Sequence, residues 1–164
     1  MGFELEAFLG PSADLRGWKR HLPSAVVCEL GGELGMVPLT GALYRELAAT
    51  LGDEAARLDA AQKYRTWPSP GMQEGVRRWA AEASRGTVLA HVSTGEFGDT
   101  SYENVTVWED GAVVRAGGGL AAVLGHFRQR GMDVGSRPID LEIHRGENAA
   151  EKWAAAAMDR ARKG

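Results

Sequence analysis

The sequence has little cysteine and no long apolar stretch. Its single cysteine, Cys28, excludes an intramolecular disulfide. No apolar run approaches the roughly 18 residues that cross a membrane. The first six residues carry acidic side chains where a secretory leader would be cationic. We therefore expect a protein of the reducing cytoplasm that makes no use of a membrane.

Common catalytic and cofactor motifs are also missing. The chain has no P-loop, no G-x-S-x-G serine and no H-E-x-x-H or cysteine-rich zinc motif. Cys28 ends the apolar segment 25–28, where burial would raise the pKa of the thiol and leave it inert. Structural or surface roles are expected for the four histidines, which are His21, His91, His126 and His144. These absences favour a protein with no catalytic residue, no metal and no cofactor.

Positive charge is absent from one long segment. The 164 residues include 19 Lys and Arg against 22 Asp and Glu, a net charge of −3. Between Arg85 and Arg115 there is no lysine or arginine, yet five acidic residues fall there: Glu96, Asp99, Glu103, Glu109 and Asp110. Such a segment argues against general nucleic-acid binding, which needs a basic face. It is either a solvated hairpin face or a surface for a cationic protein partner.

Composition and periodicity indicate the fold class. With 44% hydrophobic and 25% charged residues, the chain is that of an ordinary globular protein, and its length suits one domain over residues 1–164. Alternating or β-branched apolar residues predict strands at 3–7, 25–28, 36–37, 87–92, 101–108, 112–114 and 139–143, the last of which could instead be a helical turn. Helical spacing predicts helices at 12–21, 40–51, 53–62, 70–83, 120–130 and 148–158. Together they indicate an α+β domain whose sheet is mainly antiparallel and packs against several helices.

Local signals mark several ends of these elements. Asp110-Gly111 predicts a tight hairpin turn, because both residues tolerate positive φ. Ser12 and Thr40 are predicted to cap helices. Asn148, with Glu151 three residues later, predicts a capping box.

Two further segments could contact a ligand or a partner. Residues 117–122 read Gly-Gly-Gly-Leu-Ala-Ala and fit the G-x-G-x-x-A pattern of dinucleotide sites. The preceding strands predict a hairpin and not a βαβ unit, so a flexible turn entering a helix is the favoured interpretation. Tyr64, Arg65 and Trp67 lie between two predicted helices and are residue types enriched in interface hot spots. They could contact a partner or fold back onto the core.

Part of the second half resembles a group of small, uncharacterised cytosolic proteins of GC-rich bacteria. The resemblance rests on Glu96-Phe97-Gly98, on Val105-Thr106-Val107-Trp108 with Gly111, and on the charged run from His144 to Glu147 before Trp153. Proteins of this kind often act as immunity proteins beside toxins. The chain departs from the pattern at 99–101, where Asp-Thr-Ser replaces an expected glycine.

We therefore expect a non-enzymatic, cytoplasmic protein-binding module, most concretely an immunity-type inhibitor of a toxin partner with a cationic surface. The alternative is a small enzyme or ligand-binding domain that uses Gly117–Gly119 and neighbouring carboxylates. A structural subunit of a larger assembly is a third possibility. Convergence of His91, His126 or His144 with Glu96 or Asp99 would favour the enzyme.

Overall fold

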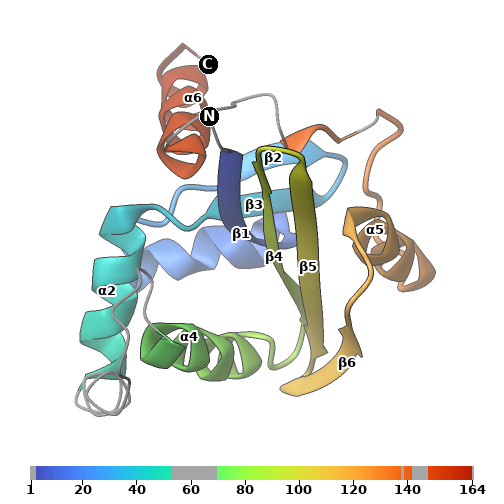
Figure 1. Cartoon of the computed structure of the whole chain (residues 1–164), viewed down its shortest axis with the longest axis horizontal. Coiled ribbons are helices and arrows are strands. Elements are labelled where there is room, and N and C mark those ends of the chain that lie inside the picture. Colours follow the sequence, from blue (N-terminus) through green and yellow to red (C-terminus); the bar gives the residue numbers. More distant parts are fainter. Residues whose placement is uncertain (1–2, 53–69, 138, 142–147, 164) are drawn as a thin grey trace.

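The computed structural model describes residues 3–52, 70–137, 139–141 and 148–163 (Figure 1). Six strands form one sheet of order β2-β3-β1-β4-β5-β6, in which every neighbouring pair is antiparallel. The fold class expected from the sequence is confirmed. The strands are β1 (Phe3–Pro11), β2 (Cys28–Gly31), β3 (Leu34–Pro38), β4 (Val88–Phe97), β5 (Thr100–Glu109) and β6 (Ala112–Ala116).

Helices cover both faces of this sheet. The described helices are α1 (Ser12–Arg16), the 3-10 turn η1 (Gly17–Arg20), α2 (Gly41–Leu51), α4 (Pro70–Ala83), α5 (Leu120–Gln129) and α6 (Ala149–Lys163). Figure 1 shows α2 and α4 on one side of the sheet and α5 on the other, while α6 crosses above β1, β2 and β3. The Thr40 cap is confirmed, because its hydroxyl oxygen accepts a hydrogen bond from Leu43 N at 3.1 Å.

Alternation along the strands sends apolar side chains into two cores. Phe8, Leu89 and Trp108 enter a core shared with α1, α2 and α4. The strand residues whose side chains point to the opposite face enter a second core with α5 and α6. This core includes Val92 and Val107 of the strands, Phe127 of α5 and Trp153 of α6. The central strands are thus apolar on both faces, although their ends are not.

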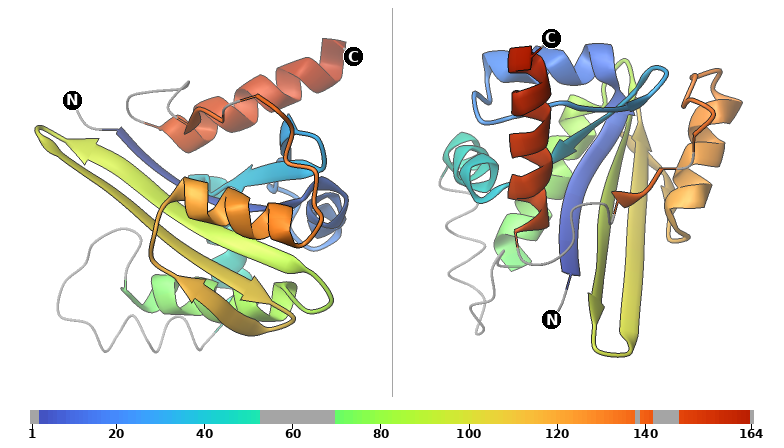
Figure 2. Two further views of the ribbon diagram at one scale, coloured as in Figure 1. Left: turned by 90° about the vertical axis from the view of Figure 1, so that its right-hand side faces the viewer. Right: turned by 90° about the horizontal axis from the view of Figure 1, so that it is seen from above.

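The β4–β5 hairpin is the longest element of the sheet. Its strands pair from Val88↔Glu109 to Phe97↔Thr100, around a two-residue turn at Gly98 and Asp99. β6 pairs with β5 only over Thr106–Glu109, so within the described residues the rest of β5 has a neighbouring strand on one side alone. Figure 2 shows the turn end of this hairpin projecting beyond α4 and α5.

Two predicted strands are displaced or absent. The segment 25–28 was expected to be a strand, but β2 begins at Cys28, because pairing with β3 is set by the Gly31-Gly32 turn, where both glycines have positive φ. The segment 139–143 was also expected to be a strand. Its described part, 139–141, is not one, since buried Leu141 packs into the core and its carbonyl accepts a hydrogen bond from Trp153 Nε1 at 3.1 Å.

Two predicted caps have other partners. The hydroxyl of Ser12 makes no cap for α1 and donates to Glu29 Oε2 at 2.8 Å. The Glu151 carboxylate, expected to complete a capping box with Asn148, accepts a hydrogen bond from Gly41 N at 3.0 Å. Glu151 therefore ties α6 to the first turn of α2, which is a tertiary contact that its position in the sequence does not reveal.

Candidate functional site

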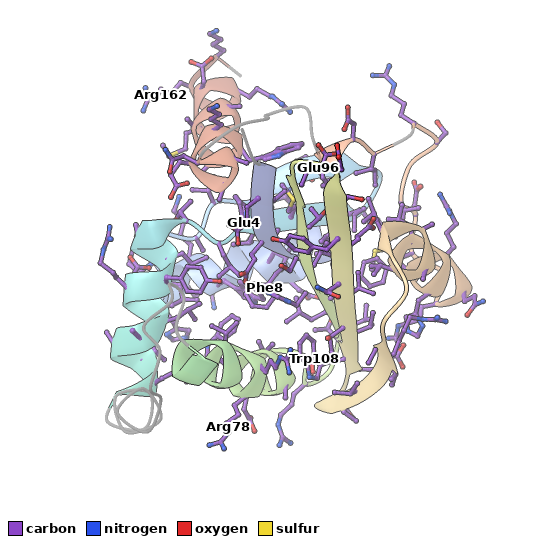
Figure 3. All side chains as sticks on the ribbon, viewed as in Figure 1. Glu4, Phe8, Arg78, Glu96, Trp108 and Arg162 are labelled. Atoms are coloured by element: carbon purple, nitrogen blue, oxygen red, sulfur yellow. The ribbon has the colours of Figure 1, made fainter. Side chains whose placement is uncertain are left out.

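The five acidic residues of the 85–115 segment fall into two groups along the β4–β5 hairpin. Glu96 and Asp99 lie at its projecting end, with Asp99 exposed in the two-residue turn and Glu96 half-exposed opposite Ser101. Within the described residues, Asp99 makes no ion pair or hydrogen bond with its side chain. Figure 3 shows Glu96 at this end of the hairpin and Trp108 at the other, beside α4.

Glu103 has an internal role. Its carboxylate accepts a hydrogen bond from the backbone N–H of Leu120, the first residue of α5. A carboxylate at a helix N-terminus satisfies an otherwise unpaired N–H group and lies at the positive end of the helix dipole. Although Glu103 is exposed, its position is fixed by the helix that it caps.

Glu109 contacts two side chains at the C-terminal end of α5, from His126 in the helix and from Arg130, its C-cap residue. Its carboxylate lies 2.6 Å from His126 Nε2 and 3.1 Å from Arg130 Nη1. His126 and Arg130 are four residues apart, so both lie on the face of α5 that meets the sheet. The hydrogen bond from His126, followed by that from Arg130, lowers the pKa of Glu109 despite its partial burial.

Asp110 locks the β5–β6 turn to the end of α4. Its Oδ1 accepts a hydrogen bond from Gly86 N at 3.0 Å, and its own N–H donates to Ser84 O and to Thr87 O, both at 3.1 Å. The buried Ser84 hydroxyl accepts from Gly111 N at 2.9 Å. Asp110 and Gly111 both have positive φ, which confirms the predicted Asp-Gly turn.

The acidic segment is therefore not one continuous patch. Glu103, Glu109 and Asp110 bind groups of α5 or of the α4–β4 connection, whereas Asp99 is exposed in the turn at the hairpin end. Glu4 on β1 adds a third carboxylate near that end, since it lies opposite Gly95 and hydrogen-bonds Tyr102. The predicted partner residues Tyr64, Arg65 and Trp67 lie outside the described residues.

The glycine turn has a form that disfavours a phosphate. Gly117 and Gly118 have positive φ and Gly119 precedes α5, as a turn entering a helix requires. The N-terminal N–H that would face a pyrophosphate already donates to Glu103. A Cβ at Gly119 would lie 3.0 Å from Glu103 Oε1, so the carboxylate sits directly against the turn. A bound phosphate would meet this negative charge.

His91 and His126 meet carboxylates other than the expected ones. His126 bonds Glu109, and His91 Nε2 lies 3.2 Å from Glu6 Oε2. Tyr44 donates to the same Glu6 oxygen at 2.6 Å. Burial alone would raise the pKa of Glu6, but the hydrogen bonds from His91 and Tyr44 together lower it. Burial and the charge of Glu6 raise the pKa of Tyr44.

This Glu6–Tyr44–His91 cluster stabilises a buried charge. Its members lie beside the aromatic group of Phe8, Trp18, Trp79 and His91, in which the rings of Phe8 and His91 are 5.5 Å apart. Among the residues with described side chains, no serine, threonine or cysteine hydrogen-bonds His91. A nucleophile activated by His91 is therefore missing from this part of the chain.

Glu6 was not among the residues predicted to form a site, because the alternation at 3–7 is that of a half-buried strand, whose acidic residues usually face solvent. Only 15% of its side chain is exposed, on the sheet face covered by α2. The signal that could have found it is Phe8, two residues later and thus on the same face. A large aromatic residue there indicates that a helix covers this face.

Cys28 is buried, as expected from its apolar setting. Its side chain is 3% exposed and Sγ lies 3.5 Å from the carbonyl oxygen of Trp153. Burial raises the pKa of the thiol to about 12, so almost no thiolate exists at neutral pH.

The described residues hold no group of three or more His, Cys, Asp or Glu side chains that could bind a metal ion. No helix among them is long and apolar enough to cross a membrane. Comparisons of the chain with protein-family models, with curated proteins and with solved structures find no match.

Proposed function

We propose that this chain is a non-enzymatic, cytoplasmic protein-binding module, and most concretely an immunity-type inhibitor that binds a toxin. The supporting observation is the projecting end of the β4–β5 hairpin, which presents the exposed carboxylate of Asp99 beyond the helices. The immunity-type assignment rests on the resemblance carried by residues 96–111 and 144–153.

Charge favours a cationic partner for this hairpin end. Glu4, Glu96 and Asp99 all lie there, and the sequence from 86 to 114 contributes no lysine or arginine. Complementary charge at the rim of an interface speeds association and rejects wrong partners more than it adds affinity. A basic surface on the partner would match this end of the hairpin.

The remaining acidic residues support the proposal in a different way. Glu103 and Glu109 fasten β5 to α5, and Asp110 fastens the opposite turn to the end of α4. These contacts fix β5 from Glu103 to the β5–β6 turn, so the projecting end of the hairpin is presented in a fixed direction. Preorganisation lowers the entropy lost on binding.

An enzyme is less well supported by the same residues. The N-terminus of α5 next to Gly117–Gly119 is occupied by Glu103, while His91 bonds Glu6 and His126 bonds Glu109. The expected convergence with Glu96 or Asp99 is not seen for His91 or His126, while His144 lies outside the described residues.

Isolation of binding proteins from the native host tests the proposal. The wild-type chain, Asp99→Lys and Asp159→Lys serve as three baits. Asp159 is an exposed residue of α6, so its reversal changes the net charge equally at a distant surface. We expect one protein to bind the wild type and Asp159→Lys in similar amounts and Asp99→Lys much less. No bound protein, or equal binding by all three baits, would contradict the proposal.

A further inference from the structure

The outer strand β6 is unusually exposed. All five of its residues are exposed, and the side chains of Val113 and Val114 are 56% and 45% exposed. Met158 on α6 is the other large apolar side chain with this exposure in the described part of the chain. Two neighbouring exposed valines on a sheet edge are the kind of surface that pairs with another strand.

The backbone of Val113 offers hydrogen-bonding groups on the open side. Asp110 and Gly111 form a two-residue turn, so Glu109 and Ala112 are the hydrogen-bonded pair that closes it. Pairs alternate along an antiparallel ladder, and the N–H and C=O of Val113 therefore point away from β5. The register shift that follows leaves Val114 as a bulge.

The opposite edge of the sheet is covered. Near β2, Glu33 N donates to Asp133 O at 2.6 Å, and Glu33 Oε2 accepts from Asp133 N at 2.9 Å. A Cβ at Gly31 would lie 3.4 Å from the carbonyl oxygen of Val134, which places the loop after α5 directly against this end of the sheet. Helix α6 also packs on β2. Of the two edges, β6 is the one that the described residues leave open.

β6 is held in place at both ends. At its start, the buried Ser84 hydroxyl accepts from Gly111 N at 2.9 Å. Beyond its end, Gly117 N donates to Val105 O at 2.9 Å. A strand fixed in this way loses little conformational entropy when it pairs with another.

β6 of one copy can pair with β6 of a second copy that is related to it by a two-fold axis. Antiparallel pairing about an axis at Val113 places Val113 opposite its symmetry mate, and the outward N–H and C=O of each can bond the other. The bulge at Val114 ends the one-to-one register, and beyond it Arg115 of one copy lies near the Asp110-Gly111 turn of the other. Both Arg115 and Asp110 are exposed, and within the described residues Arg115 makes no ion pair. The two-fold axis generates two such pairs, each between Arg115 of one copy and Asp110 of the other.

We propose that β6 pairs with β6 of a second copy of this chain, antiparallel across a two-fold axis at Val113. The pairing joins the two sheets into one and closes on itself, because each copy has a single such edge. The bulge at Val114 limits the ladder to a few residues, so the interface is at the small end of the usual range and the dimer is expected to be weak. This dimer is independent of the toxin partner proposed above.

Sedimentation of the full chain over about a hundredfold range of concentration tests the pairing. We expect a concentration-dependent shift from monomer to dimer. Val113→Lys places two like charges opposite each other and should weaken association about tenfold or more. Met158→Lys, the same kind of exchange at the other exposed apolar side chain, should associate like the wild type. A monomer throughout, or equal association by Val113→Lys, would overturn the proposal.

Amide exchange of the wild-type chain gives a second readout that needs no variant. The Val113 amide should exchange rapidly at low concentration and become protected as dimer forms. Protection that does not change at Val113 while the chain dimerises would place the interface elsewhere and overturn the proposal. Circular dichroism of Val113→Lys checks that the variant is folded.

Discussion

The carboxylate of Glu103 accepts a hydrogen bond from the backbone N–H of Leu120, and this contact joins β5 to the first turn of α5. Glu103 is thereby separated in function from Asp99, four residues earlier, which projects into solvent. A segment that has no cation of its own is balanced by a helix N-terminus and by α5 side chains at its base. At its outer end, Asp99 is exposed.

Removal of the Glu103 carboxylate should destabilise the fold. Glu103→Ala leaves the N–H of Leu120 without its acceptor, which typically costs about 0.5–2 kcal/mol for a lost helix cap. Glu103→Gln keeps an acceptor oxygen and should lose less. Urea unfolding measures both, and equal stability of the wild type and Glu103→Ala would show that the contact is not a cap.

Stability should fall in acid because of Glu109 and Glu6. Both carboxyl groups have a folded-state pKa below the usual value of 4.5. Their contribution is fully present above that value and is lost as pH falls through the folded-state pKa. Glu109→Gln removes the contribution of Glu109 to this pH dependence. The urea midpoint of the variant should therefore drop less than that of the wild type between neutral pH and acid. A drop of equal size would contradict the role given to His126 and Arg130.

The thiol of Cys28 should be inert in the folded protein. With the pKa raised to about 12 and the side chain buried, labelling by a thiol reagent should be slow in buffer and fast in urea. Cys28→Ala should bind the same partner as the wild type. Rapid labelling of the folded chain would mean that the thiol is accessible and ionised.

Nucleotides should not bind the glycine turn. Glu103 occupies the N-terminus of α5 and would repel a phosphate beside Gly117–Gly119. Calorimetry with adenine nucleotides and dinucleotides is therefore expected to give no heat of binding. Micromolar binding that is lost in Gly118→Val would favour the enzyme.

Some local signals in the sequence predicted local structure, whereas Ser12 and Glu151, both expected in helix caps, bond other residues. The Asp110-Gly111 turn and the Thr40 cap are confirmed, because each depends on residues within three positions of one another. The strand predicted at 139–143 is wrong for its described part, since alternation of apolar residues also suits a segment that lies across a core. The strand at 25–28 is displaced because its partner, β3, sets the pairing.

The contacts of the acidic residues were harder to predict, because they depend on partners that are distant in the sequence. Glu103, Glu109 and Glu151 all bond residues at least 17 positions away, and nothing in their own neighbourhood names those partners. Glu6 shows the opposite case, in which an acidic residue expected in solvent is buried beneath α2 with Tyr44 and His91. The sequence shows where the acidic residues lie, whereas the fold determines which of their carboxylates are bonded within the protein.

The central claim is that Asp99, at the projecting end of the hairpin, steers a cationic partner. The most direct measurement is the association rate of the partner with wild-type, Asp99→Lys and Asp159→Lys chains at several salt concentrations. Asp99 does not have positive φ, so lysine fits its backbone and the melting temperature should barely change. We predict slower association and a flatter salt dependence for Asp99→Lys alone. An Asp99→Lys chain that is folded and associates at the wild-type rate with the same salt dependence would contradict the claim.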